Sequence, residues 1–158
     1  MKSENQKSET NYFGIVAAGG SGARVSSGIA KQYLEINGQS LLEISISVLI
    51  NSVNFTKLIV VIPKSDMKKC CYLKEKFKQI ELVPGGNTRC ESVFEGLRFL
   101  NSMSKANDWC MVHDAARPCV QKKDILGLID EVKDSNTGGI LGAPVIDTLK
   151  KVDSDNQI

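Results

Sequence analysis

The chain contains 158 residues, which is about the length of one domain with a single hydrophobic core. Hydrophobic residues make up 42% of it and charged residues 24%, so disordered and fibrous classes of protein are excluded. The net charge is only +2, and basic and acidic residues are both dispersed along the chain. This argues against a dedicated surface for nucleic acid or for an anionic membrane. A small anionic ligand stays compatible, because it needs only a few local cations.

The N-terminus and the cysteines favour a cytoplasmic protein. The first ten residues, MKSENQKSET, lack the apolar segment of a secretory signal, and no run reaches the ~18 apolar residues of a membrane helix. The five cysteines show neither a CxxC motif nor a disulfide framework, which favours reduced thiols. We therefore expect a flexible tail over residues 1–11 and one domain over 12–158, with no membrane or nucleic-acid partner.

Short apolar runs alternate along the chain with segments of helical periodicity. The first run, residues 12–18, contains Ile and Val and leads directly into glycines, which is typical of a buried strand. Ser40 predicts the start of a helix over 41–49. The remaining predicted elements are strand 57–62, helix 65–78, strand 80–83, helix 91–100, strand 109–112, helix 124–132 and strand 139–145.

This alternation predicts an α/β fold with a doubly wound, mostly parallel sheet. In such sheets, ligands bind at the carboxyl ends of the strands. A glycine loop follows the first strand, Gly85-Gly86 follows the third, and His113-Asp114 follows the fourth. We therefore expect three polar clusters, distant in sequence, to meet at one edge of the sheet.

The first cluster is the glycine loop with Gly19, Gly20 and Gly22. Glycines let the backbone turn sharply and present N–H groups to an anion, although an ordinary turn between a strand and a helix explains the loop alone equally well. A Walker A loop is excluded because Lys and Ser or Thr do not follow Gly22, and the dinucleotide fingerprint fails at Val25.

Two cations accompany this loop, Arg24 and Lys31. Positive charge beside a group of backbone N–H donors suits a triphosphate, whose charge must be neutralised before an anionic nucleophile can attack it. Either cation alone is more often a surface residue.

The second cluster is GGNTR, residues 85–89, followed by Ser92. Its flexible backbone and short polar side chains suit recognition of a base edge, and they equally suit a turn with a helix cap.

The third cluster is HDAARP, residues 113–118. Asp114 at a strand end can hold Mg²⁺, and Arg117 can bind a second phosphate, or the two can form a structural ion pair. We interpret His113 as a packing and hydrogen-bonding residue rather than a catalyst. This set of candidate residues favours Mg²⁺-assisted transfer between two phosphates over acyl, glycosyl or redox chemistry.

Taken together, these motifs resemble those of the 2-C-methyl-D-erythritol 4-phosphate cytidylyltransferases. The matching segments are, in the same order, AAGGSGAR, AKQY, GGNTRCESV, VHDAARP and GGILGAPVIDTLK, and the resemblance covers residues 13–158. HDAARP with PVxDTLK is specific, whereas many nucleotidyltransferases share the glycine loop. The resemblance implies a Rossmann-like nucleotidyltransferase fold in which CTP reacts with methylerythritol phosphate in the presence of Mg²⁺. The products would be pyrophosphate and the cytidine diphosphate intermediate of non-mevalonate isoprenoid synthesis, and no enzyme nucleophile is required.

The resemblance also implies a role for each matching residue. Arg24 and Lys31 correspond to the catalytic cations that hold the triphosphate and stabilise charge at the α-phosphate. Asp114 corresponds to the substrate-site carboxylate associated with Mg²⁺, and Arg117 to a contact of methylerythritol phosphate. The nucleotide-binding residues would be Ala17, Ala18, Gly19, Gly20 and Gly22 in the loop around CTP, Gly86, Asn87, Arg89 and Ser92 in the segment that recognises cytosine, and Ala115 beside the ribose.

Two features depart from the family pattern. Ala30 stands where the family usually has a proline, which leaves the loop before Lys31 less restricted in the unfolded chain. In the family, DTLK leads into a β-arm that swaps across a dimer, whereas this chain ends at Ile158. We therefore expect the start of a β-arm at the C-terminus, a C-terminally truncated sequence, and a homodimer for the full-length protein.

Three other functions stay open at this point. The related ribitol 5-phosphate cytidylyltransferases carry a motif closer to HDAVRP, which favours the first family. A catalytically incomplete fragment would bind CTP without turnover. A regulatory or scaffold protein of the same fold would not bind CTP, and the presence of Arg24, Lys31, Asp114 and Arg117 argues against it.

Overall fold

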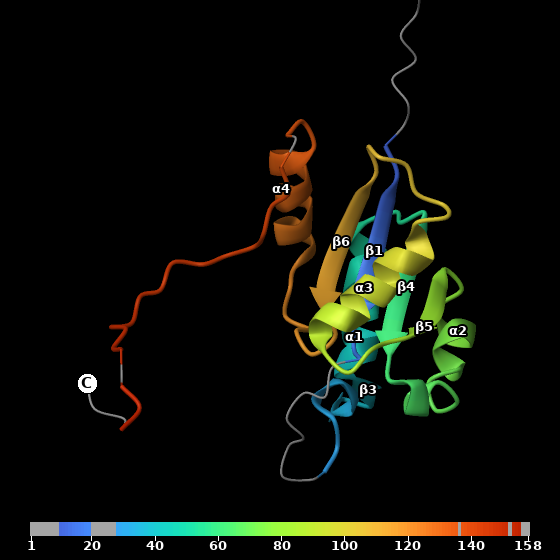
Figure 1. Cartoon of the computed structure of the whole chain (residues 1–158), viewed down its shortest axis with the longest axis horizontal. Helices are drawn as coiled ribbons and strands as arrows, with labels where there is room; N and C mark the ends of the chain where they lie inside the picture. The colour runs from blue at the N-terminus through green and yellow to red at the C-terminus, as the bar shows by residue number, and fades with distance from the viewer. Residues whose placement is uncertain (1–9, 20–27, 136, 152, 156–158) are drawn as a thin grey trace, which may run out of the picture.

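The structure is a computed structural model that describes residues 10–19, 28–135, 137–151 and 153–155. Its centre is a parallel four-stranded sheet with the strand order β5-β4-β1-β6 (Figure 1). In this sheet β1 (Tyr12–Ala17) lies between β4 (Lys57–Ile62) and β6 (Trp109–Asp114), and β5 (Ile80–Pro84) forms one edge. The predicted α/β class with a parallel sheet is confirmed.

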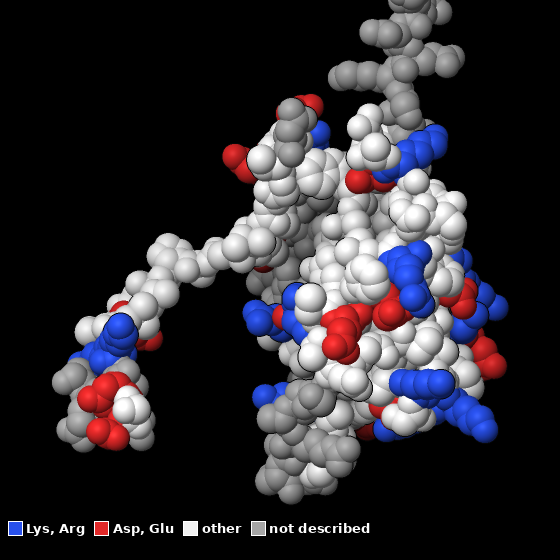
Figure 2. All heavy atoms as spheres, in the orientation of Figure 1, with Lys and Arg blue, Asp and Glu red and all other residues white. Residues whose placement is uncertain are grey.

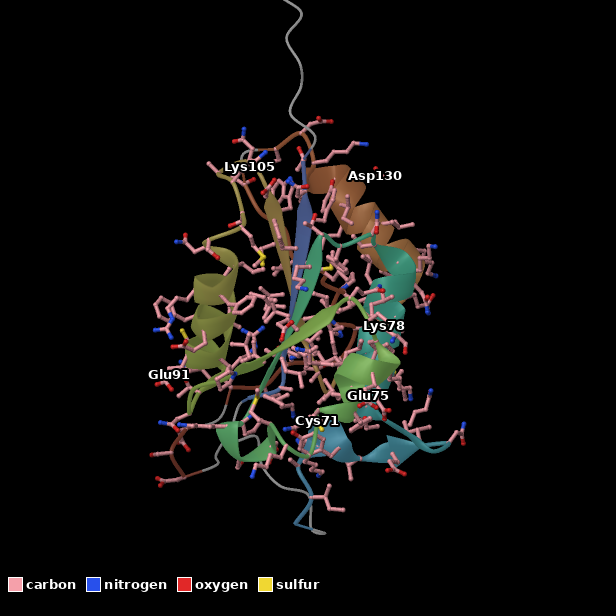
Figure 3. The ribbon with its side chains drawn as sticks, turned by 90° about the vertical axis from the view of Figure 1, so that its right-hand side faces the viewer. Cys71, Glu75, Lys78, Glu91, Lys105 and Asp130 are labelled. Carbon is pink, nitrogen blue, oxygen red and sulfur yellow. The ribbon has the colours of Figure 1, made fainter. Side chains whose placement is uncertain are left out.

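Helices cover both faces of the sheet, which explains why the strands are continuous apolar runs. One face packs against α3 (Arg89–Leu100), where Ile15, Ile59 and Val61 are fully buried. The other face packs against α1 (Leu41–Ser52), α2 (Tyr72–Lys76) and α4 (Lys122–Val132), as the view along the sheet in Figure 3 shows. Within the described residues, no helix is long and apolar enough to cross a bilayer.

Two capping boxes start the helices on either side of the sheet. Ser40 begins α1, where its hydroxyl accepts from the N–H of Glu43 while the Glu43 carboxylate accepts from the N–H of Ser40. Thr88 and Glu91 form the same arrangement at the start of α3. The predicted N-cap at Ser40 is therefore confirmed.

A short hairpin between the first strand and α1 was missed by the sequence prediction. It consists of β2 (Glu35–Ile36) and β3 (Gln39–Ser40), and it follows a 3-10 turn, η1 (Lys31–Tyr33). Asn37 and Gly38 join the two strands with positive φ angles of 51° and 76°. The Asn-Gly pair is a sequence signal for such a turn.

Two predicted elements differ from the structure. The helix expected over 65–78 is divided into a 3-10 turn, η2 (Lys64–Asp66), and the five-residue α2. This segment has too few apolar residues for a continuous buried face, and within α2 only Leu73 is buried.

The strand expected over 139–145 is wrong, and no strand forms elsewhere in the described residues after Asp114, so the start of a β-arm is not observed there. Residues 138–143 instead line a groove beside α4 and β6, and the chain beyond them runs away from the sheet (Figure 1). Ile140 is 91% and Ile146 96% exposed. Apolar composition suggested a buried strand, but a strand needs a partner for its backbone hydrogen bonds, and no strand among the described residues pairs with this segment.

The folded body begins earlier than the expected tail boundary. The Asn11 backbone N–H and side-chain amide donate to Asp108 Oδ1 at 3.0 and 3.1 Å, and the Asn11 carbonyl accepts from Trp109 N at 3.0 Å. Asn11 is thus fixed to the start of β6, while residues 1–9 of the expected tail lie outside the described part of the chain.

Candidate functional site

The carboxyl ends of the strands bring the three predicted clusters to one edge of the sheet. Ala17 at the end of β1 stands in register with Asp114 of β6 and with Val61 of β4. Backbone hydrogen bonds continue past the strands, from Ala18 N to Val61 O at 2.8 Å and from Ala115 N to Ala17 O at 3.1 Å. Gly85 N likewise donates to Ile62 O at 2.8 Å. The predicted meeting of the clusters is therefore observed for their described residues.

Gly19 lies in close contact with the start of α3. A Cβ atom added at Gly19 would be 2.5 Å from Ser92 Oγ and 3.4 Å from the Cα of Gly85. Ser92 is fully buried, and its hydroxyl donates to Thr88 O at 2.8 Å. The hydroxyl predicted to contact a base is thus bonded within the second cluster, and it fills the space beside Gly19 of the first.

The second cluster is shaped by Glu91. Its Oε2 accepts hydrogen bonds from the backbone N–H groups of Asn87, at 2.6 Å, and Thr88, at 3.3 Å. A Cβ at Gly86 would collide with the Glu91 side chain, so this position requires glycine. Asn87 and Arg89 are exposed at the rim of the site, by which we mean the edge of the sheet formed by the carboxyl ends of its strands. A ligand can reach them there.

Asp114 lies between two guanidinium groups. Its Oδ1 accepts from Arg89 Nε at 2.7 Å, and its Oδ2 pairs with Arg117 Nε at 2.9 Å. The arginine side chains are 61% and 77% exposed, whereas the Asp114 side chain is 25% exposed. The ion pair with Arg89 joins the second cluster to the third, and nothing in the sequence spacing indicated it.

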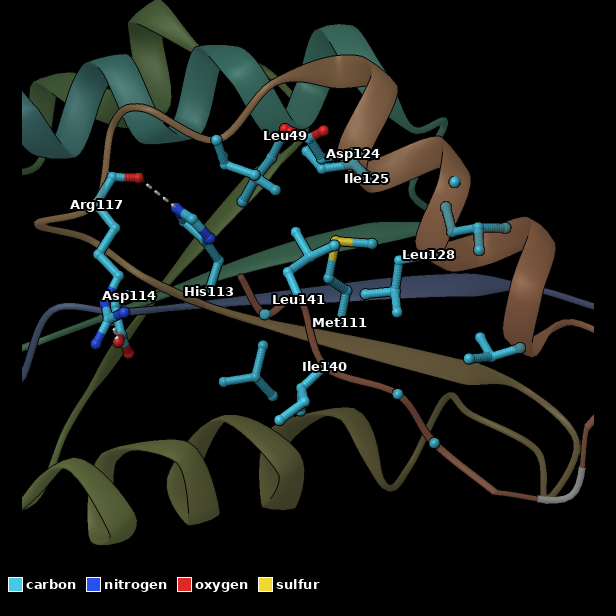
Figure 4. A pocket seen from close by; sticks show the side chains of 18 of the residues that line it. Leu49, Met111, His113, Asp114, Arg117, Asp124, Ile125, Leu128, Ile140 and Leu141 are labelled. Atoms are coloured by element: carbon cyan, nitrogen blue, oxygen red, sulfur yellow. Dashed lines mark hydrogen bonds and ion pairs between the residues drawn. The ribbon is translucent and has the colours of Figure 1, made fainter. Parts of the chain in front are cut away.

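His113 fixes the turn that carries Asp114 and Arg117. Its Nε2 lies 3.0 Å from the carbonyl oxygen of Arg117, the contact drawn as a dashed line in Figure 4. Burial lowers the pKa of His113, which favours the neutral imidazole, and a carbonyl can only accept, so Nε2 carries the proton. This arrangement agrees with the predicted hydrogen-bonding role.

Ala115, the predicted neighbour of the ribose, is 2% exposed. Its carbonyl accepts from Ser45 Oγ of α1 at 2.9 Å, in addition to the backbone bond to Ala17. The turn after β6 is therefore anchored to both the sheet and α1.

Lys31 occupies the first position of η1 and is exposed. The next residue, Gln32, is 8% exposed and donates from Nε2 to Ala18 O at 3.0 Å, so the turn with Lys31 is attached to the end of β1. Ala30 has a φ of −66°, the angle that the usual proline would impose. Within the described residues, Lys31 forms no ion pair and is available to an anion.

Three other predicted site residues, Gly20, Gly22 and Arg24, lie outside the described residues. Their roles stay predictions.

A groove of about 1330 Å³ extends from the rim along β6, between this strand, α4 and residues 138–143. Figure 4 shows His113, Asp114 and Arg117 at one end of the groove, and Met111, Leu128 and Leu141 farther along it. The polar end coincides with the third predicted cluster, whereas the apolar part follows the open edge of the sheet.

The donor set at the rim constrains how a metal ion would bind. Within the described residues, no three His, Cys, Asp or Glu side chains gather into a metal-binding group. Mg²⁺ is often held by one or two carboxylates and completes its shell with water and phosphate oxygens. Asp114 therefore fits an Mg²⁺ ion that binds together with phosphate groups once the ion replaces a contact to Arg89 or Arg117, and it does not by itself form a complete metal site.

Comparisons with known proteins show which family the chain resembles. The family model "IspD: 2-C-methyl-D-erythritol 4-phosphate cytidylyltransferase" matches residues 13–158. A relative with the same description from Vibrio vulnificus (strain CMCP6) is 38% identical over 152 residues, which cover 96% of this chain and 64% of the relative. A second, from Shewanella halifaxensis, is 39% identical over 144 residues, which cover 91% of this chain and 61% of the relative.

Solved structures show the same similarity. A crystal structure of 4-diphosphocytidyl-2C-methyl-D-erythritol synthase aligns with a TM-score of 0.79 at 29% identity, over 92% of this chain and 65% of the other. The 2-C-methyl-D-erythritol 4-phosphate cytidylyltransferase of Francisella tularensis aligns with a TM-score of 0.71 at 32% identity, over 93% of this chain and 63% of the other. The chain thus spans a little under two thirds of the length of these relatives. Because the family model covers nearly all of the chain, the chain belongs to the 2-C-methyl-D-erythritol 4-phosphate cytidylyltransferase family.

Proposed function

We propose that the protein transfers a cytidylyl group from CTP to 2-C-methyl-D-erythritol 4-phosphate and releases pyrophosphate. The observation that carries this proposal is the edge of the sheet where the end of β1 with Gly19, the start of α3 and the HDAARP turn meet. Asp114 lies there between Arg89 and Arg117, in a chain whose family is named for this reaction. The product would be the cytidine diphosphate intermediate of isoprenoid synthesis.

The reaction we propose is a direct displacement. An oxygen of the methylerythritol phosphate attacks the α-phosphorus of CTP, the bond to the bridging oxygen of the β-phosphate breaks, and pyrophosphate leaves with the electron pair. Such a reaction depends on positioning of the two substrates and neutralisation of their charge more than on covalent catalysis by the protein. This requirement agrees with the exposed cations Lys31, Arg89 and Arg117 at this edge of the sheet.

We assign the charges of the site as follows. Lys31 would neutralise the triphosphate as charge builds on the leaving group, and Arg24 would assist it. Arg117 would bind the phosphate of the acceptor, since its guanidinium is 77% exposed. Asp114 would hold Mg²⁺ together with the phosphates, and this ion would supply further charge neutralisation when bound.

The nucleotide would lie along the glycine loop with its base toward the start of α3. Ala17, Ala18 and Gly19 would surround CTP, with Gly20 and Gly22 continuing the loop. Gly86, Asn87 and Arg89 would contact the cytosine, supported by the buried Ser92. Ala115 would lie beside the ribose.

We further propose a cytoplasmic homodimer. All five cysteines are free, as expected in a reducing compartment. The exposed apolar side chains between Ile140 and Leu149 favour burial against a second copy. On the face shown in Figure 2, basic and acidic side chains are interspersed, which agrees with small-molecule substrates rather than nucleic acid.

The test is release of pyrophosphate from CTP and Mg²⁺ with two acceptors, methylerythritol phosphate and ribitol 5-phosphate, and calorimetric titration with CTP alone. We expect turnover with methylerythritol phosphate and much less with ribitol 5-phosphate. The opposite preference would identify ribitol 5-phosphate as the acceptor. Binding of CTP without turnover would indicate a nucleotide-binding module, and absence of CTP binding would overturn the proposal.

A further inference from the structure

The 3-10 turn that carries Lys31 is held from two directions. On one side, Gln32 donates to the carbonyl oxygen of Ala18 at the end of β1. On the other side, the Tyr33 hydroxyl donates to Oδ2 of Asp66 at 2.6 Å. Asp66 is the last residue of η2, which follows β4, so the two contacts attach the turn to the carboxyl ends of two neighbouring strands.

The contact between Tyr33 and Asp66 is supported by its surroundings. Lys69 Nζ lies 4.1 Å from the centroid of the Tyr33 ring, and the thiol of the buried Cys70 lies 3.6 Å from the Tyr33 oxygen. Burial, with the hydrogen bond to Asp66, raises the pKa of Tyr33. The raised pKa favours the protonated hydroxyl, which is the form that donates to Asp66.

The geometry of a 3-10 turn explains why Lys31 remains free. Such a turn has three residues per turn, so successive side chains point about 120° apart. Gln32 is buried and Tyr33 is half-buried, which leaves the third direction, toward solvent, for Lys31. With Gln32 and Tyr33 both attached, the backbone of Lys31 has little freedom to rotate relative to the sheet.

We propose that Tyr33 and Asp66 are positioning residues, which act through the backbone of η1 to hold the Lys31 ammonium at the site. The catalytic role of Lys31 rests on the proposed function, whereas the attachment of the turn does not. Asp66 belongs to a lysine-rich segment that composition alone suggests is only a solvated surface. The structure makes one residue of this segment a support for the site.

Hydrogen exchange on the protein without substrate tests the attachment. The amides of Tyr33 and Leu34 donate to Ala30 O, at 2.9 Å, and Lys31 O, at 3.1 Å, so their exchange rates report opening of η1. We expect Tyr33→Phe to speed exchange of both amides roughly tenfold, because it removes one charge-assisted hydrogen bond and keeps the ring. Tyr12→Phe is the matched control, since Tyr12 begins β1 at the opposite end of the sheet.

A second pair of variants tests the acceptor. Asp66→Ala should speed exchange at η1 as Tyr33→Phe does, and Asp66→Asn should restore most of the protection because an amide oxygen still accepts from the hydroxyl. Unchanged exchange in both Tyr33→Phe and Asp66→Ala would overturn the proposal.

Kinetics test whether the attachment acts through Lys31. In the protein with measurable turnover, Tyr33→Phe should lower kcat roughly tenfold with little change in the KM for CTP. In a Lys31→Ala background, Tyr33→Phe should not lower kcat any further. An additive loss of kcat would contradict a role through Lys31. If the unaltered protein shows no turnover, the proposed function fails, and the exchange experiment still decides whether Tyr33 and Asp66 hold the turn.

Discussion

At the scale of single residues, the rim combines side chains that are held and side chains that are free. Ser92 and Ala115 are buried, the Ser92 hydroxyl donates to Thr88 O and the Ala115 carbonyl accepts from Ser45 Oγ, and both residues help to shape the site. Lys31 is exposed and, within the described residues, forms no ion pair. A free cation on a fixed turn is suited to charge that develops during a reaction, because no other partner must first be displaced.

Lys31→Ala should therefore lower kcat far more than it weakens CTP binding. A preorganised group at developing charge is typically worth about 10²- to 10³-fold in rate, whereas the change in CTP affinity should be much smaller. Steady-state kinetics and calorimetry measure the two effects. Lys78→Ala removes the same charge just before β5, at the opposite end of the sheet, and should change neither. Equal losses of rate and affinity in Lys31→Ala would show that Lys31 only binds.

Gly19 offers a second prediction at this scale, because its close contact with Ser92 leaves no room for a Cβ. Gly19→Ala should lower the free energy of unfolding by about 1–3 kcal/mol, as overpacking of a filled interior does. Gly127→Ala should act in the opposite direction, with a gain of roughly 0.5–1 kcal/mol, since Gly127 lies within α4 and nothing is within 4 Å of an added Cβ. Urea unfolding of both variants measures the difference. A tolerated Gly19→Ala would mean that Ser92 can move.

At the scale of elements, the sequence was informative where a segment's own pattern decides its structure. Apolar runs located β1, β4, β5 and β6 to within two residues, and Ser40 located the start of α1. The prediction of elements failed where contacts with other parts of the chain decide the structure of a segment. Residues 139–145 resemble a buried strand but pair with no strand in the described part of the chain, and 65–78 lacks the apolar face that a long helix needs.

Glu43 connects α1 with α2, and the shift of its pKa leads to a prediction about how stability depends on pH. Its carboxylate accepts from Ser40 in the capping box of α1 and from Lys76 Nζ of α2 at 2.8 Å. Burial would raise the pKa of Glu43, but the hydrogen bonds from Lys76 and Ser40 outweigh it and lower the pKa. A lowered pKa in the folded state means that the stabilisation is present above the pKa of the unfolded state, about 4.3, and is lost as pH falls through the folded value.

Glu43→Gln should thus be less stable than the unaltered protein at pH 7, by about 0.5–2 kcal/mol for a weakened cap. Its stability should also fall less between pH 7 and pH 3. Urea midpoints at the two pH values measure this difference. Glu75→Gln, at an exposed position of α2, is the control and should follow the unaltered protein. An equal fall with pH in Glu43→Gln would contradict the assignment.

At the scale of the whole molecule, topology explains both what was predictable about the site and what was not. Parallel strands place all their carboxyl ends at one edge, so the meeting of the clusters followed from the alternation of elements. The ion pair of Arg89 with Asp114 did not, because it depends on where α3 begins relative to the end of β6. The same order of strands leaves β6 at an edge, with Val112 38% exposed and a groove beside it.

The exposed apolar side chains of the C-terminal segment lead to a prediction about assembly. Ile146 is 96% and Leu149 80% exposed, and burial of one such side chain is worth about 1.5–3 kcal/mol. If a second copy covers them in the proposed homodimer, Ile146→Lys and Leu149→Lys should each weaken dimerisation by at least roughly tenfold. Thr148→Lys adds the same charge at an exposed polar position between them and should have a smaller effect. Sedimentation velocity over a range of protein concentrations measures the dissociation constants. A dimer that is equally stable in all three variants would place the interface elsewhere on the molecule, and a monomer at every concentration would contradict the homodimer itself.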